Sequence, residues 1–221
     1  MFTLPSILLP IDFSERCVAA SQYAVALARR FQSELHLLNV IDLRVYGMYG
    51  MGNDDAALER FGPGSRKAAE AEMGSFVPDE LKNLTVKRVL LCGDPAHEIA
   101  KYAAANRISL IVMPTHGYGR FRRFLLGSVT TKVLHEVECP VWTGVHLESH
   151  PEPSDMQFRR ILVALEPWKA GQALEWAWQF GREVGAQVKI VHALPPVYGP
   201  GSSYFAAEMK THVKGAAEQA I

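Results

Sequence analysis

Short apolar runs alternate with amphipathic stretches over the first two thirds of the chain. Ser6–Asp12 is apolar up to its last residue, which is typical of a strand buried on both faces of a parallel sheet. Residues 15–32 place apolar side chains along one side of a helix, and Leu35–Ile41 is a second apolar run. A strand, a helix and a strand in this order predict a parallel pair joined by a right-handed crossover.

The alternation continues beyond this first unit. Residues 42–64 are rich in glycine and methionine and are predicted to form a loop. The segments that follow are predicted to be helices over 65–76 and 95–107, strands over 84–91, 108–113 and 139–145, and a helix that begins at Gly127-Ser128. This regular order predicts an α/β domain with a doubly wound, five-stranded parallel sheet. The strand over 139–145 is expected at an edge of that sheet.

Two helices have clear local signals. Asp94 is suited to the N-cap position, and Pro95 to the first helical position after it. In the helix that begins at Gly127-Ser128, apolar side chains recur along one side: Val129, Val133, Leu134 and Val137.

The beginning of the chain recurs near its end. Residues 148–157 are polar and carry two prolines, which is typical of a linker. Residues 158–221 then repeat the strand, helix and strand of the start, with Glu166 in the place of Asp12. We expect a complete domain over 1–147 and a partial second copy over 158–221. Either the chain is a shortened form of a longer tandem protein, or the half-copy is stabilised by docking on another surface.

Composition and charge exclude several classes of protein. Hydrophobic residues make up 48% and charged residues 21%, as in globular proteins with a packed core. Lys plus Arg and Asp plus Glu are 23 each, so no net charge favours nucleic acid or an anionic membrane. No apolar run approaches the roughly 20 residues that span a bilayer. The three cysteines have no CxxC spacing, which argues against a disulfide framework or a zinc site and for a cytoplasmic protein without metal.

Candidate chemistry gathers at one edge of the predicted sheet. Asp12 ends the first strand and Pro114 ends the fourth, and ligands of open parallel sheets bind beyond such carboxyl ends. A glycine-containing segment then leads from Gly117 to Gly127-Ser128, where a helix N-terminus can direct N–H groups at phosphate. Simpler roles are open for the same residues, because Asp12 and Ser128 are both also suited to capping helices.

These motifs together resemble those of the universal stress protein family, in its tandem form. The resemblance rests on Pro10-Ile-Asp12-Phe-Ser14, Asn39-Val40-Ile41-Asp42, Gly93-Asp94-Pro95, Thr115-His-Gly117, Leu125-Leu-Gly127-Ser128-Val129 and Cys139-Pro140-Val141. It implies a Rossmann-like fold of the adenine nucleotide alpha hydrolase type. The ATP-binding members carry Gly-x-x-Gly, nine residues and Gly-Ser, and Gly117 with Gly127-Ser128 fits this pattern. The first glycine position, however, is Pro114.

The resemblance also implies a ligand and its contacts. The ligand is ATP or AMP, with Mg²⁺ accompanying ATP. Asp12 would hold the ribose, the backbone of Val40 would face adenine, and Pro10 and Met113 would enclose the base. The phosphates would be surrounded by Gly117, Gly127, Ser128, Val129 and Thr130. Pro114 has no N–H to donate, and one lost neutral hydrogen bond lowers affinity roughly three- to tenfold, so we expect weakened binding rather than none.

Three functions remain open after this comparison. The first is a regulatory protein of the stress response that binds an adenine nucleotide without catalysis. The second is a nucleotide-free dimerisation module, and the third is a slow ATPase or an ATP pyrophosphatase. The sequence has no GxxxxGK[ST] motif and no evident nucleophile–base pair, which disfavours an enzyme. In the family the last strand commonly pairs with its counterpart in another domain, which implies an antiparallel contact through Val141–Val145, within a homodimer or with a second tandem domain.

Overall fold

The computed structural model describes residues 2–42, 63–115, 126–144, 157–164 and 171–191. The chain divides into two compact units, one over Thr3–Met156 and one over Gln157–Ile221 with Met1–Phe2. The boundaries proposed from the sequence, with a linker over 148–157, stay predictions. No helix among the described residues is both long and apolar enough to cross a membrane.

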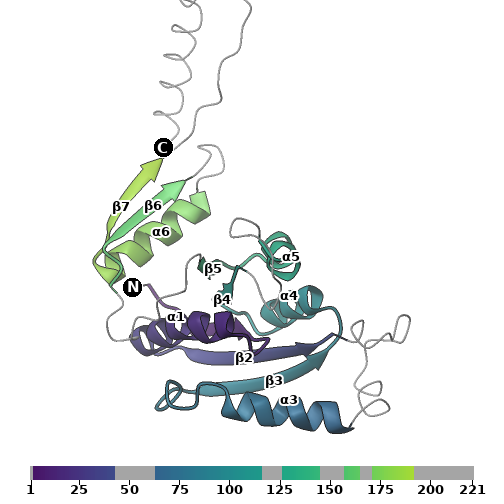
Figure 1. Cartoon of the computed structure of the whole chain (residues 1–221). Helices are drawn as coiled ribbons and strands as arrows, with labels where there is room; N and C mark the ends of the chain where they lie inside the picture. Colours follow the sequence, from purple (N-terminus) through teal and green to yellow (C-terminus); the bar gives the residue numbers. More distant parts are fainter. Residues whose placement is uncertain (1, 43–62, 116–125, 145–156, 165–170, 192–221) are drawn as a thin grey trace, which may run out of the picture. The chain divides into compact units, whose positions relative to one another are not determined.

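The larger unit is built on a five-stranded parallel sheet, as predicted (Figure 1). Its strands are β1 (Ser6–Pro10), β2 (Glu34–Ile41), β3 (Val86–Cys92), β4 (Leu110–Pro114) and β5 (Val141–Gly144). Their order across the sheet is β3-β2-β1-β4-β5, and all four pairs of neighbours are parallel. The order therefore reverses between β1 and β4, and β5 lies at an edge, as its position in the sequence predicts.

Helices cover both faces of this sheet. They are α1 (Glu15–Phe31), α3 (Pro63–Ser75), α4 (Pro95–Ala105) and α5 (Ser128–Glu136). With right-handed crossovers, this strand order places α1 and α3 on one face and α4 and α5 on the other. The second pair packs over a cluster of buried side chains: Leu8, Leu38, Ala96, Ile99, Ala103, Ile108, Ile111, Met113 and Val133. Strands β1 and β4 are almost wholly apolar because helices cover them on both sides.

The predicted helix starts are confirmed in one case and corrected in two. Asp94 is the N-cap of α4, where its side chain accepts hydrogen bonds from the N–H groups of Ala96 and His97. Helix α1 is capped by Ser14 rather than Asp12, because Asp12 lies two residues too early. Helix α5 is capped by Gly127, so Ser128 is its first helical residue and not its cap.

The apolar stripe predicted on α5 is narrower than its sequence indicates. Val133 is completely buried, but Leu134 is 41% exposed. Adjacent helical residues point about 100° apart, so a helix that packs on one narrow face can bury only one of the two. Leu134 therefore lies largely outside the packed face of α5, although the sequence places it on the apolar side of the helix.

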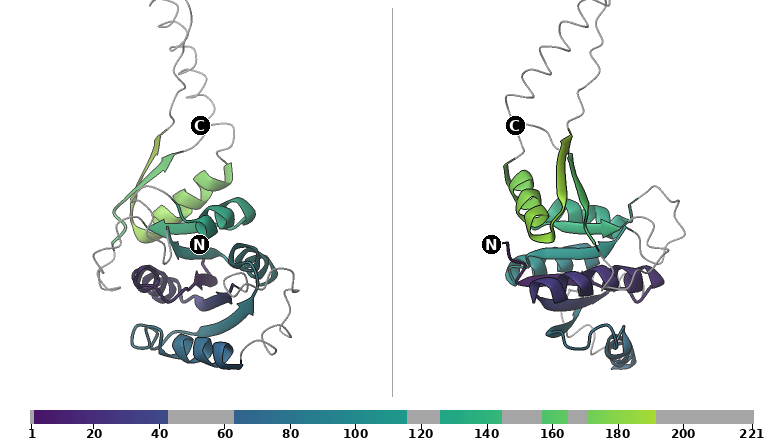
Figure 2. Two further views of the ribbon diagram at one scale, coloured as in Figure 1. Left: turned by 45° about the vertical axis from the view of Figure 1, so that its right-hand side comes forward. Right: turned by 90° about the vertical axis from the view of Figure 1, so that its left-hand side faces the viewer.

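The smaller unit is a parallel strand–helix–strand element of β6 (Arg160–Ala164), α6 (Gly171–Val184) and β7 (Gln187–Val191). Helix α6 lies along one face of the strand pair in both views of Figure 2. A glycine permits close packing there, since a Cβ atom on Gly181 would lie 2.4 Å from Cγ2 of Val188. The same order of elements opens the larger unit. That this unit is a partial copy of the family domain stays a prediction, and Glu166 lies outside the described residues.

Candidate functional site

The carboxyl ends of β1, β2 and β4 form the edge at which the sequence places the site. Strand β1 pairs with β2, with Pro10 opposite Leu38, and it also pairs with β4. Because these strands are parallel, the residues that follow them leave the sheet at the same edge. This edge lies at the reversal of strand order, where open α/β sheets bind their ligands.

Asp12 follows β1 and is held in a dense set of hydrogen bonds. Its Oδ1 atom accepts from the N–H of Ser14 at 3.1 Å, from Oγ of Ser14 at 2.6 Å and from Sγ of Cys17 at 2.9 Å. Its own N–H donates to Sγ of Cys17 at 3.4 Å. Within the described part of the chain, Oδ2 accepts no hydrogen bond. The carboxylate is thus fixed at one oxygen and open at the other.

The turn between β1 and α1 sets the direction of Asp12. Phe13 has φ of 62°, a left-handed conformation that is unusual for a residue other than glycine or asparagine. Its ring packs against that of Phe76 in a T-shaped arrangement, with 6.1 Å between the ring centroids, and this contact helps to hold the turn. Ser14 then adopts an extended conformation and accepts a hydrogen bond from the N–H of Cys17 through its side chain. The chain enters α1 at Glu15, three residues after Asp12.

The end of β2 is tied to the end of β1. Nδ2 of Asn39 is buried and donates to the carbonyl of Ile11 at 2.8 Å, and the N–H of Ile11 donates to the carbonyl of Leu38 at the same distance. The next residue, Val40, is half-buried and pairs with Leu91 of β3. Val40 therefore lies near the carboxyl end of β2, at the same edge of the sheet as Asp12. Pro10, which is expected to enclose the base, is buried as the last residue of β1.

The N-terminus of α5 is fastened to the end of β4. The N–H of Gly127 donates to the carbonyl of Thr115 at 2.7 Å, and Oγ1 of Thr130 donates to the carbonyl of Pro114 at 3.1 Å. Met113 and Pro114 are both buried at the end of the strand. Thr130 is itself only 3% exposed, so its hydroxyl serves first to anchor the helix.

The first turn of α5 carries open hydrogen-bond donors. The N–H groups of Ser128, Val129 and Thr130 have no acceptor within the described residues, as expected for the first three positions of a helix. Ser128 is exposed, and Val129 is half-buried. These three donors, together with the helix dipole, can bind an anion.

The structure therefore brings eight of the nine predicted site residues to one edge of the larger unit. They are Pro10, Asp12, Val40, Met113, Gly127, Ser128, Val129 and Thr130. Gly117 lies outside the described residues. Their individual roles toward a ligand stay predictions.

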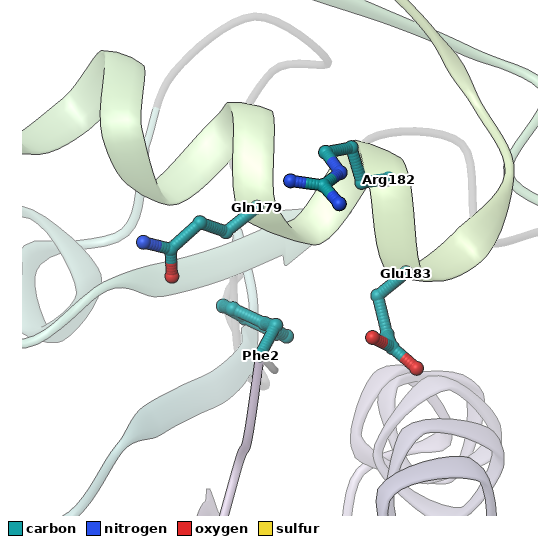
Figure 3. Close-up of a pocket in the computed structure, with 4 residues that line it drawn as sticks. All are labelled: Phe2, Gln179, Arg182 and Glu183. Carbon is teal, nitrogen blue, oxygen red and sulfur yellow. The ribbon is translucent and has the colours of Figure 1, made fainter.

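A separate pocket lies in the smaller unit and contains none of these residues. It has a volume of about 300 Å³ and is lined by Phe2, Gln179, Arg182 and Glu183 (Figure 3). Figure 3 shows three of these side chains projecting from α6 around the ring of Phe2, which also contacts Trp176 and Phe180. No carboxyl edge or helix N-terminus contributes to it, so it does not replace the site above.

Three residues that shape the site were not predicted from the sequence: Ser14, Cys17 and Asn39. Ser14 directly precedes an acidic residue and an amphipathic stretch, so its role as N-cap could have been found from the local pattern. Asn39 belongs to one of the motifs that carry the family resemblance, although the motif does not reveal its hydrogen bond, and Cys17 has no signal in the sequence. Their partners Asp12 and Ile11 become neighbours only through the turn into α1 and the β1–β2 pairing.

A doubly wound parallel sheet, with a carboxylate and a helix N-terminus at the reversal of strand order, defines a Rossmann-like α/β domain. The model of the universal stress protein family matches residues 4–143. This chain belongs to the universal stress protein family, as the sequence motifs predict.

Individual relatives agree with this assignment. A universal stress protein of Methanocaldococcus jannaschii is 29% identical over 136 residues, covering 61% of this chain and 78% of the relative. The structure of a universal stress protein from Lactobacillus plantarum matches with a TM-score of 0.51 at 28% identity, covering 65% of this chain and 99% of that one. One from Archaeoglobus fulgidus matches with a TM-score of 0.62 at 26% identity, covering 97% of this chain and 75% of that one.

Proposed function

We propose that the protein binds an adenine nucleotide, ATP or AMP, at the carboxyl edge of its five-stranded sheet and acts as a regulatory protein of the stress response. One observation carries this proposal. Asp12, with its open Oδ2, lies just after β1. The start of α5, with its three open N–H groups, is hydrogen-bonded to the end of β4, the strand beside β1. A ribose and its phosphates require an acceptor and a set of donors of this kind.

In the proposal, different residues of this edge bind the ribose, the phosphates and the base. Oδ2 of Asp12 accepts from ribose hydroxyls, and the first turn of α5 donates to the phosphates. Pro10, Met113 and the backbone of Val40 bind the base, for which an apolar wall and a few backbone groups are suitable. Mg²⁺ accompanies ATP as part of the ligand.

Calorimetric titration of the full chain with MgATP, AMP and adenosine tests the proposal. We expect saturable binding of ATP and AMP, with a rise in thermal stability at saturating nucleotide. Absence of both heat and thermal shift at millimolar nucleotide would refute it and would favour the nucleotide-free dimerisation module.

The proposal treats ATP as a ligand and not as a substrate. Nucleotide recovered from the titrated sample should therefore still be ATP after hours at 25 °C. If ADP, or AMP with pyrophosphate, appeared only in samples that contain the protein, the slow ATPase or the ATP pyrophosphatase would be favoured instead.

Replacing Pro114 by glycine should leave ATP affinity unchanged or raise it by up to about tenfold, because the change restores one backbone N–H near the expected phosphates. Pro114→Ala restores the same N–H without the freedom of glycine and serves as the matched control. Calorimetry on both variants measures the effect. Weaker binding in both would show that the proline ring contributes to the site.

We also propose that two copies pair through β5. Strand β5 is an edge strand, and its four residues are half-buried rather than covered. An edge strand offers unpaired N–H and C=O groups to a second chain. Sedimentation at micromolar concentration should give a dimer, and Thr143→Pro should shift it toward monomer because proline removes a donor from the strand. A monomeric unaltered protein would contradict this.

The proposal places one nucleotide site within residues 1–221. The smaller unit is proposed to be a partial second copy, which the match to the Archaeoglobus fulgidus structure over 97% of the chain supports. Residues 158–221 contain no counterpart of the Gly117–Ser128 segment. Glu166 in the place of Asp12 therefore does not indicate a second site.

A further inference from the structure

Cys17 lies within the hydrogen bonds that hold Asp12. It is the third residue of α1 and is 2% exposed. Its Sγ atom lies 2.9 Å from Oδ1 of Asp12 as a donor, and it accepts from the N–H of Asp12 at 3.4 Å. The thiol and the aspartate thus close a ring of two hydrogen bonds, one through the backbone and one through the carboxylate.

This ring limits how far the Asp12 carboxylate can turn. A carboxylate oxygen has about two lone pairs, and Oδ1 already has three donors, so a further donor must approach Oδ2. Both hydrogen bonds from Ser14 reach the same oxygen, and the last torsion of an aspartate side chain is broad, so with Ser14 alone the carboxylate can still turn about that oxygen. A donor on helix α1 adds a second point of attachment.

We propose that Cys17 is a positioning residue, whose thiol holds the Asp12 carboxylate so that Oδ2 meets the 2′ and 3′ hydroxyls of a ribose and thereby favours ribonucleotides over sugars that lack these hydroxyls. This inference rests on the proposed nucleotide binding. It assigns Cys17 no contact with the ligand, since the side chain is buried behind the aspartate.

The surroundings keep the thiol in the form that can donate. Burial, and then the charge of Asp12, raise the pKa of Cys17 to about 12. The group is therefore protonated throughout the physiological range, and it lacks the thiolate character that makes a cysteine reactive. Cys17 thus acts as a fixed donor and not as a redox sensor.

The experiment compares ATP with 2′,3′-dideoxy-ATP by calorimetry in Cys17→Ala and Cys17→Ser. We expect Cys17→Ala to weaken ATP about fivefold while the affinity for dideoxy-ATP changes less than about twofold. Cys17→Ser retains a donor and should recover most of the ATP affinity. Cys139→Ala, which removes a half-buried thiol elsewhere, should leave both affinities unchanged.

Each result has one meaning. Equal losses for both nucleotides in Cys17→Ala would show a merely structural role, and no loss for either would show that the thiol does not position Asp12. Both overturn the inference while the proposed function stands. No binding of ATP by the unaltered protein would overturn the proposed function itself.

A measurement without ligand checks the contact directly. The infrared S–H stretching band of Cys17, assigned by its loss in Cys17→Ala, should move to higher frequency in Asp12→Ala, because the acceptor that remains, the carbonyl of Pro10 at 3.9 Å, is neutral and more distant than the carboxylate. An unmoved band would show that the thiol does not donate to Asp12 and would overturn the inference.

Discussion

Replacing Ser128 by aspartate should weaken ATP binding by about two orders of magnitude and leave adenosine binding nearly unchanged. The new carboxylate would stand at the first position of α5, where the proposal places the phosphates. Two unit charges about 4 Å apart repel by roughly 1 kcal/mol in water and roughly 4 kcal/mol near a protein surface, which brackets the expected loss. Calorimetry with ATP and adenosine measures it.

The same change should not unfold the protein. An acidic side chain in the first turn of a helix is stabilising by about 0.3–1 kcal/mol through the helix dipole, so the melting temperature should stay or rise. Ser128→Asn is the matched neutral control and should alter ATP affinity only slightly. An equal loss of adenosine and ATP in Ser128→Asp would place the phosphates elsewhere.

Replacing Asp12 by alanine should weaken ATP binding about 10- to 100-fold, because hydrogen bonds to a charged group contribute about 1.5–3 kcal/mol each. The loss should be confined to nucleotides with ribose hydroxyls, so dideoxy-ATP should bind the variant and the unaltered protein with similar affinity. Calorimetric titration of both nucleotides gives the two ratios.

Asp94→Ala is the matched control for this change. Asp94 is also a carboxylate that follows a strand and accepts backbone hydrogen bonds at the start of a helix. Its Oδ2 atom also lies 3.4 Å from Nζ of Lys132 on α5, a partly exposed ion pair of a kind that contributes little. Its loss should therefore lower thermal stability, as for Asp12→Ala, and change nucleotide affinity by less than about twofold. If Asp94→Ala weakened ATP as strongly as Asp12→Ala, the effect would come from altered helix starts and not from a ribose contact.

Most of the fold could be predicted from local patterns. Buried parallel strands are short apolar runs, and β1, β2 and β4 have this form, so the sequence predicts that these strands exist and gives their ends to within a few residues. Strand β5 could be placed at an edge because it is the last of the alternating series. The exposure of Leu134 could not be predicted, since its sequence spacing does not show how narrow the packed face of α5 is.

The sequence predicts only those site residues that stand at a recognisable position, such as the end of a strand or the start of a helix. Asp12 and Gly127-Ser128 lie at the ends of a strand and the start of a helix, and the topology brings such positions together. Which residue caps each helix depended on a shift of one or two positions, and local propensity does not resolve such a shift. The contact of Cys17 with Asp12 depends on the left-handed backbone conformation at Phe13. The sequence does not indicate this conformation, because the residue is neither glycine nor asparagine.

Mapping by amide NMR tests the central claim, that an adenine nucleotide binds at the carboxyl edge of the larger unit. On titration of the labelled full chain with MgATP, the largest shifts should occur at Asp12, Val40 and Ser128–Thr130. The amides of Arg160–Ala164 in the smaller unit should not move. Shifts that cluster in the smaller unit, or no shifts at millimolar ATP, would contradict the account.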